Sequence, residues 1–475
     1  MRKRGVILVA IAAALAFGAT ALTAGARAAD APRVVTGFVA KTLCTGTFVS
    51  GLDPDRLFAD TTAAMPGVNL IAWAIGVNVD RTRKQVAATL FGGVESRATH
   101  RDGLGCMLMH GGTAADATLP KPEPAQPSLL PEIAGPGIVT PANPDLRRAL
   151  DQAFAESRQA PPRNTKAVVV VKNGKVIAER YADGYSKDTP VLGFSMTKSV
   201  ISALTGILVR QGKLAINEPA PIAEWRNPKD PHHGITIAHL LRHTSGLAMG
   251  SSLNASIMSA FAPVNRMKFS ERDMAGFAAT ADLEAAPGEH WNYHDGNTVL
   301  LSRVIRDAVG GRAADVLQFA RRELFEPLGM RNVTIEFDAT GTPEGSSQMV
   351  ATARDWARFG LLYLNDGTVG SRRILPEGWV KSSAELSPGA WVGMGAGFWT
   401  NHGDSVGSRY RTSLGMPREA FYASGVLGQY TVIVPSERLV VVRLGITGPQ
   451  FDIEGVSRLI ADVISATRET GQPGK

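Results

Sequence analysis

A serine and a lysine three residues apart are the first side chains in this sequence that could do chemistry together. Ser195 and Lys198 lie in the stretch GFSMTKSV, at the start of a predicted helix that ends near Gln211. Their i, i+3 spacing places the hydroxyl and the amine on one helix face. A serine becomes a good nucleophile when a base takes its proton, and a lysine can be that base if burial or nearby cations lower its pKa. Taken singly, the pair is also compatible with an N-cap serine beside a solvated lysine.

A tyrosine about 100 residues further along could complete this chemistry. Tyr293 lies in PGEHWNYHDGNTVLLSRVI, where a Pro-Gly turn precedes a predicted amphipathic helix. A phenol near a lysine can relay protons between a serine and a leaving group. The alternative is an ordinary buried tyrosine where a helix begins.

A glycine-containing segment near the C-terminus could bind the substrate. Residues 423–429 (ASGVLGQ) lead into a predicted strand hairpin. Gly425 would let a backbone approach a ligand closely, and an edge strand has free N–H groups for a substrate carbonyl. The alternative is a β-bulge or a tight turn.

Serine and lysine, then tyrosine, then a glycine-containing edge strand, in this order, resemble the serine beta-lactamase and penicillin-binding protein superfamily. The resemblance is to its class C beta-lactamase and esterase branch, and most of all to 6-aminohexanoate-dimer hydrolases. It spans about residues 145–470. Four further segments resemble the same branch: ITIAHLLRHTSGL (235–247), RRELFEPLGM (321–330), MVATARDWARFGLLYLNDG (349–367) and SGVLGQYTVIVP (424–435).

The resemblance implies a role for each residue of the set. Ser195 matches the acylating nucleophile and Lys198 its general base. Tyr293 matches the tyrosine that passes a proton to the leaving group and helps to activate water for deacylation. The oxyanion hole would consist of the backbone N–H groups of Ser195 and of Val426, directly after Gly425. No cofactor is implied, and the partner is a small-molecule substrate.

Two positions depart from the family pattern. The tyrosine motif usually ends in Asn, but Asp295 stands here. A carboxylate facing Lys198 would favour the charged amine and weaken it as a base, so Asp295 is expected to point elsewhere or to have a substrate role. Beta-lactamases and transpeptidases also have Lys-Thr-Gly on the edge strand, where the cation helps to hold the drug's carboxylate. This chain has Ala423-Ser424-Gly425, which fits the amide hydrolases and esterases better.

Other polar residues predict structure rather than catalysis. His243 lies at a predicted helix end. Asp355 and Arg358 have helical spacing and are expected to form an ion pair. No metal site is predicted, because the remaining candidate histidines lack the spacing and the cysteine partners of metal ligands: His232, His233, His290 and His294.

The surrounding pattern predicts the elements that would position the site. Residues 144–157 have helical spacing, and AVVVVKNGKVIAERYADG (167–184) predicts a hairpin with a tight turn at Asn173-Gly174. Helices dominate to about residue 330. Residues 421–445 predict two more strands, and residues 453–469 a closing amphipathic helix. The predicted fold is α/β of the α+β kind: an antiparallel sheet flanked by helices, with a mostly helical subdomain, as in beta-lactamases and transpeptidases.

The N-terminus predicts export. Arg2, Lys3 and Arg4 precede an apolar run and an Ala-Arg-Ala site, the pattern of a secretory signal peptide over residues 1–28. The alternative is an uncleaved membrane anchor. Removing the four basic residues of this segment, the fourth being Arg27, lowers the formal charge from +7 to +3. That balance gives no argument for nucleic acid as a partner. The expected location is the periplasm or the exterior.

Three further segments follow the signal peptide. Residues 33–112 are predicted to be a small β-rich module with strand-like runs at 34–49 and 84–94, and 113–143 is a Pro-rich linker. Residues 144–475 would form the hydrolase domain. The two cysteines of the chain, Cys44 and Cys106, lie within the first module, where an oxidising compartment would let them form a disulfide.

The sequence as a whole predicts an exported serine hydrolase that cleaves amide or ester bonds of small substrates through an acyl-enzyme on Ser195. An esterase or a weak beta-lactamase using the same site is an alternative. So is a non-catalytic penicillin-binding or sensor protein. Oligomeric state and physiological substrate have no signature in the sequence.

Overall fold

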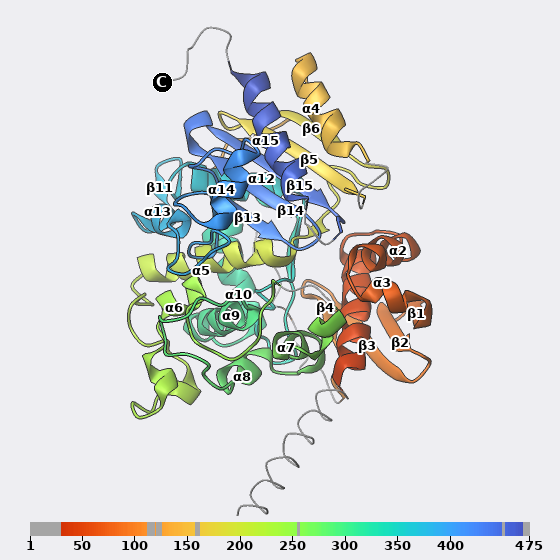
Figure 1. The fold of residues 1–475 in the computed structure, drawn as a ribbon, viewed down its shortest axis with the longest axis vertical. Coiled ribbons are helices and arrows are strands. Elements are labelled where there is room, and N and C mark those ends of the chain that lie inside the picture. Colours follow the sequence, from red (N-terminus) through yellow and green to blue (C-terminus); the bar gives the residue numbers. More distant parts are fainter. Residues whose placement is uncertain are drawn as a thin grey trace, which may run out of the picture.

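The computed structural model describes residues 30–111, 119, 126–156, 162–253, 257–448 and 452–468. It consists of a central sheet with its helices, a helical subdomain and an N-terminal module (Figure 1). The predicted signal peptide and the first part of the predicted linker lie outside these residues. Within the described chain, every helix is too short or too polar to cross a bilayer.

The central sheet has six strands in the order β12-β13-β14-β15-β5-β6, and every neighbouring pair is antiparallel. The predicted hairpin forms β5 and β6, joined by Asn173 and Gly174 with φ of 51° and 79°. These left-handed conformations match the right-handed twist of the strands. The strands are β5 (Thr165–Lys172), β6 (Lys175–Tyr181), β12 (Trp399–Thr400), β13 (Phe421–Gly425), β14 (Gln429–Val434) and β15 (Leu439–Gly445).

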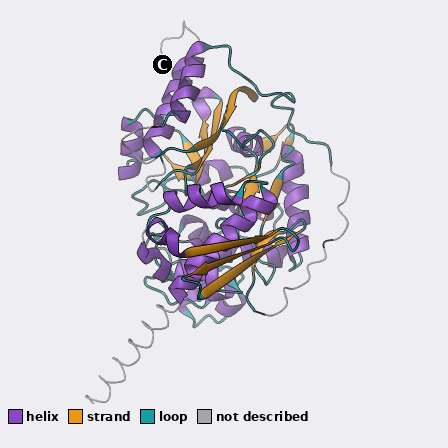
Figure 2. Cartoon of the chain, turned by 90° about the vertical axis from the view of Figure 1, so that its right-hand side faces the viewer, coloured by secondary structure: helices purple, strands orange, loops and turns teal. Residues whose placement is uncertain are grey.

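Helices cover both faces of this sheet (Figure 2). On one face α4 (Pro144–Phe154) and α15 (Ile453–Thr467) bury their apolar stripes against alternate residues of β5, β14 and β15. On the other face α5 (Thr197–Arg210) and α12 (Ala353–Leu364) pack on the intervening residues. Because side chains alternate along a strand, one Val-rich strand such as β5 supplies both cores.

The helical subdomain follows α5, whose stripe of Val200, Ile201, Leu204, Ile207 and Leu208 is buried as the sequence predicts. Its core helix is α9 (Asp295–Val309), which contacts α5, α6 and α8. A small sheet, in the order β7-β9-β8, links the subdomain to the start of α5. The other elements are α6 (Ile237–Arg242), α7 (Pro263–Ser270), α8 (Met274–Ala279), α10 (Ala313–Ala320), α11 (Glu326–Leu328), α13 (Trp379–Ala384), α14 (Val406–Ser413), β7 (Val191–Leu192), β8 (Val333–Ile335), β9 (Met349–Ala351), β10 (Thr368–Val369) and β11 (Arg372–Arg373).

The N-terminal module, residues 30–108, begins with helix where strands were predicted. Residues 30–44 are α-helical and a π-helical turn covers Thr45–Val49. The prediction of strands over 34–49 is therefore wrong. Residues 36–47 are all buried, and an apolar run buried on every side has no periodicity that separates helix from strand. The rest of the module is α2 (Pro54–Ala64), α3 (Val68–Ile71) and an antiparallel meander of β1 (Ile75–Asp80), β2 (Gln85–Leu90), β3 (Val94–Arg101) and β4 (Gly105–Leu108).

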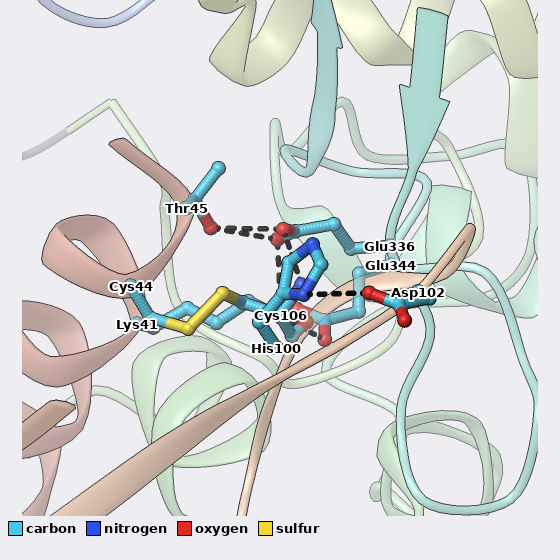
Figure 3. The surroundings of a disulfide bond; sticks show 8 residues. All are labelled: Lys41, Cys44, Thr45, His100, Asp102, Cys106, Glu336 and Glu344. Atoms are coloured by element: carbon cyan, nitrogen blue, oxygen red, sulfur yellow. Dashed lines mark hydrogen bonds and ion pairs between the residues drawn. A yellow bond between two sulfur atoms is a disulfide. The ribbon is translucent and has the colours of Figure 1, made fainter. Parts of the chain in front are cut away.

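A buried ion cluster joins this module to the rest of the chain, beside a disulfide that lies within the module (Figure 3). Cys44 and Cys106 are bonded, with their Cα atoms 6.0 Å apart. Beside them Lys41 is paired with Glu336 at 3.2 Å and Glu344 at 2.6 Å, and both glutamates lie more than 200 residues further along the chain. The apolar core of the module continues into residues that flank the catalytic candidates, namely Leu192, Phe194, Val350, Val426 and Leu427.

Candidate active site

Ser195 lies in a single 3-10 turn, η3 (Phe194–Met196), directly before α5. Phe194 has a φ of 46°, a left-handed conformation that costs a bulky residue free energy and must be held by its surroundings. Thr197 holds it, since its hydroxyl donates to Phe194 O at 2.7 Å and accepts from Met349 N at 3.1 Å. The serine is thus fixed at the point where β7, β9 and α5 meet.

Lys198 contacts Ser195 directly. Its Nζ lies 2.9 Å from Ser195 Oγ, 2.8 Å from the carbonyl oxygen of Ser346 and 2.6 Å from Asp295 Oδ1. The lysine side chain is only 2% exposed. Three oxygen neighbours match the three N–H donors of an ammonium group.

The charge state of Lys198 differs from what the sequence argument requires. Burial lowers the pKa of Lys198, but the Asp295 carboxylate and the Tyr293 phenol raise it, and the net result is a pKa above that of an ordinary lysine. Asp295 therefore does not point elsewhere, and the first of the two alternatives for it is wrong. Lys198 can accept the serine proton only in the fraction of molecules where it is neutral, and that fraction rises with pH.

Asp295 is shared with a second lysine, which sequence reasoning did not single out. Lys268 Nζ, from α7, lies 2.6 Å from Asp295 Oδ2. Burial raises the pKa of Asp295, but the two lysines outweigh it and hold that pKa well below its usual range. The signal that could have pointed to Lys268 is indirect: a buried carboxylate requires cations nearby.

Tyr293 lies beside the lysine, as the sequence order predicts. The centre of its ring is 5.0 Å from Lys198 Nζ. The ring is held between those of His243 and Trp399, at centroid distances of 4.7 and 5.3 Å. These two ring contacts limit the movement of the phenol beside Lys198.

Gly425 brings the end of β13 against the serine. A Cβ built on Gly425 would lie 2.2 Å from Gly193 O and 3.0 Å from Ser195 N, so only glycine fits here. β12 pairs with Phe421 and Tyr422 alone, and among the described residues no strand lies outside positions 423–425. Ser424 is half-buried and pairs across the strand with Tyr430. The end of β13, directly before Val426, therefore lies against the backbone of Ser195 at an edge of the sheet.

The part of the sequence that contains these residues matches a known protein family. Residues 150–455 match the sequence profile of the Beta-lactamase family. The chain belongs to the Beta-lactamase family. A 6-aminohexanoate-dimer hydrolase of Paenarthrobacter ureafaciens is 24% identical over 63% of this chain and 75% of its own length. An esterase of Burkholderia gladioli is 27% identical over 54% of this chain and 67% of its own length.

Solved structures agree on the fold of this beta-lactamase family member. A putative 6-aminohexanoate-dimer hydrolase from Bacillus anthracis aligns with a TM-score of 0.52 at 22% identity, covering 71% of this chain and 86% of that chain. A penicillin-binding protein homologue from Caulobacter crescentus gives 0.52 at 19% identity, covering 71% and 100%. The protein is thus a serine hydrolase related to beta-lactamases, with amidase and esterase relatives.

In this beta-lactamase family member the buried histidines support the site. His243 ends α6 in a left-handed conformation with a φ of 59°. Asn297 Nδ2 lies 3.2 Å from a ring nitrogen of His243 and 3.2 Å from one of His294. Burial lowers the pKa of His294 to about 4 and that of His243 well below its usual value. Both rings are therefore neutral at physiological pH, and His243 packs against Tyr293.

Asp355 and Arg358 do not form the ion pair that their spacing predicts. The carboxylate of Asp355 accepts from Thr352 Oγ1 at 2.8 Å and from two backbone N–H groups. Arg358 instead pairs with Glu132 at 2.7 Å. The N-cap residue Thr352 and the backbone N–H groups of Arg331 and Asn332, directly before β8, already occupy the aspartate, so helical spacing alone does not decide the partner.

Proposed function

We propose that the protein is an exported serine hydrolase that cleaves amide or ester bonds of small substrates through an acyl-enzyme on Ser195. The distance of 2.9 Å between Lys198 Nζ and Ser195 Oγ carries this proposal, because it is within proton-transfer reach. Export is supported by the disulfide. The proposed units are the signal peptide 1–28, the module 33–112, the linker 113–143 and the hydrolase domain 144–475.

The proposed reaction has two stages, acylation and deacylation of Ser195, and Lys198 and Tyr293 transfer protons in both. Ser195 Oγ attacks the substrate carbonyl carbon while its proton passes to neutral Lys198, and the carbonyl π-electrons move to the oxygen. The N–H groups of Ser195 and Val426 stabilise that oxyanion. As the tetrahedral intermediate collapses, the bond to the leaving amine or alkoxide breaks, and Tyr293 passes it a proton. Water then attacks the ester on Ser195 by the same steps in reverse, which frees the acid and restores the serine.

The edge strand favours linear amides and esters over beta-lactams. The residues at the end of β13 are Ala423, Ser424 and Gly425, and none of them is a cation that could hold the carboxylate of a beta-lactam drug. Ser424, half-buried on this strand, is a candidate for a substrate hydrogen bond. A substrate with a small neutral acyl group has no carboxylate that needs such a cation, so it can bind at this edge without an ion pair.

A substrate panel on the purified protein tests the proposal. We expect turnover of a short-chain chromogenic ester and of a linear oligoamide, with slower hydrolysis of nitrocefin. Ser195→Ala should reduce each rate to that of buffer. Undiminished activity of Ser195→Ala would refute the acyl-enzyme, whereas fast nitrocefin hydrolysis would refute only the substrate class.

One observation favours a second function, a non-catalytic penicillin-binding sensor. The Asp295–Lys198 pair raises the pKa of the lysine, and a charged lysine is a poor base for deacylation. A sensor would form a covalent adduct on Ser195 that persists for hours. Multiple turnovers in the substrate panel would exclude this role.

A further inference from the structure

Lys268 completes a row of three charged side chains that ends at the serine. Its Nζ lies 2.6 Å from Asp295 Oδ2, and Asp295 Oδ1 lies 2.6 Å from Lys198 Nζ. Asp295 is 3% exposed and Lys268 is 16% exposed. One buried carboxylate thus lies between two ammonium groups, one of which reaches Ser195.

Asp295 contributes more than any other charged neighbour to the raised pKa of Lys198, and the buried histidines nearby add no charge. The Tyr293 ring lies 5.0 Å from Lys198 Nζ and contacts the ring of His243, and His294 is the N-cap residue directly before Asp295, where α9 begins. The two histidines are neutral, as described above. Asp295 is therefore the anion that acts on Lys198, and Lys268 is the cation that competes for it.

We infer that Lys268 is a positioning residue that neutralises Asp295 and so allows Lys198 to serve as the base for Ser195. This inference rests on the proposed function. Without Lys268, the full charge of the carboxylate would act on Lys198 and hold its proton more strongly. With Lys268 present, the carboxylate still orients both ammonium groups. Its charge is shared between them, so it stabilises the proton on Lys198 less strongly.

The N-terminal module fixes the helix that carries Lys268. Phe269, the next residue of α7, packs edge-on against Phe38 with ring centres 5.6 Å apart. A Cβ on Gly37 would lie 2.5 Å from Phe269 O, so helix 30–44 touches the backbone of α7 directly. The module therefore holds α7 at the distance from which Lys268 reaches Asp295.

A double-mutant cycle tests this role through kcat/KM for a chromogenic ester at pH 8 to 9. We expect Lys268→Gln to lower kcat/KM by about 10- to 100-fold, the equivalent of about one to two pH units in the pKa of Lys198. Asp295→Asn should move the rising limb of the pH profile to lower pH, because burial then decides the pKa of Lys198. In the Asp295→Asn background, Lys268→Gln should cost less than about threefold.

Two further variants make the result decisive. Lys268→Arg keeps the charge and should retain most activity. Arg272→Gln removes an exposed cation two residues after the end of α7 and should leave the pH profile unchanged. An equal loss in both Asp295 backgrounds would show that Lys268 only packs, and an unchanged rate in Lys268→Gln would show that it has no role. Either result overturns this inference alone, since activity of Ser195→Ala is what would overturn the proposed function.

Discussion

Lys198→Met is expected to lower kcat/KM for an ester by about 10²- to 10⁴-fold, the usual contribution of a general base. The methionine keeps much of the side-chain volume but cannot take the proton of Ser195. The fold should survive, because Asp295 keeps its other partner, Lys268, at 2.6 Å. Steady-state kinetics across pH 6 to 10 measures the effect, and the rise of the rate with pH seen in the wild type should disappear.

A second buried lysine provides the matched control for this variant. Lys166 is also 2% exposed, and its Nζ contacts Asp60 at 2.8 Å and the ring of Tyr185. Lys166→Met should lower stability without removing the pH dependence of the rate. If Lys198→Met kept more than a tenth of the wild-type kcat/KM at neutral pH, another group would have to be the base.

Lys41→Met is expected to reduce the free energy of unfolding by about 3–5 kcal/mol, because it leaves buried carboxylates without their cation. Lys41 is 1% exposed and contacts Glu336, Glu344 and the carbonyl oxygen of Cys106. Burial raises the pKa of Glu344, and Lys41 opposes this effect. In the variant Glu344 should take up a proton, so the loss should be greatest at alkaline pH and smaller in mild acid.

The same substitution should also lower activity. Glu344 precedes Ser346, whose carbonyl oxygen accepts a hydrogen bond from Lys198, so the module supports the catalytic lysine through this segment. Denaturant unfolding and ester kinetics on one preparation measure both effects. Lys84→Met is the control, since Lys84 pairs with Asp102 on the surface of the same module, where an ion pair contributes about 0–1 kcal/mol. Equal stability of the two variants would contradict this account.

The sequence predicted the fold class because its strongest signals are local. The Asn173-Gly174 turn, the stripe of α5 and the apolar alternation of the terminal strands each specify an element within a few residues. The family resemblance then ordered these elements, and that assignment is confirmed by the Beta-lactamase match and by the solved structures. Residues 34–49 were misassigned because burial on every side removes the periodicity on which such a prediction depends.

The site was less accessible to sequence reasoning, because its charges meet across elements. Lys268 and Asp295 are on different helices, and no spacing rule connects them. The effect of Asp295 on Lys198 depends on a distance of 2.6 Å that no motif encodes. The roles of Ser195, Lys198 and Tyr293 remain predictions, supported by their proximity.

Intact-mass spectrometry after brief exposure to a fluorophosphonate tests the central claim most directly. We predict one added phosphonyl group per wild-type chain, located by peptide mapping to the segment that contains Ser195, and no addition to Ser195→Ala. Labelling of the Ser195→Ala protein, or a wild-type chain whose adduct lies on another residue, would contradict nucleophilic catalysis by Ser195.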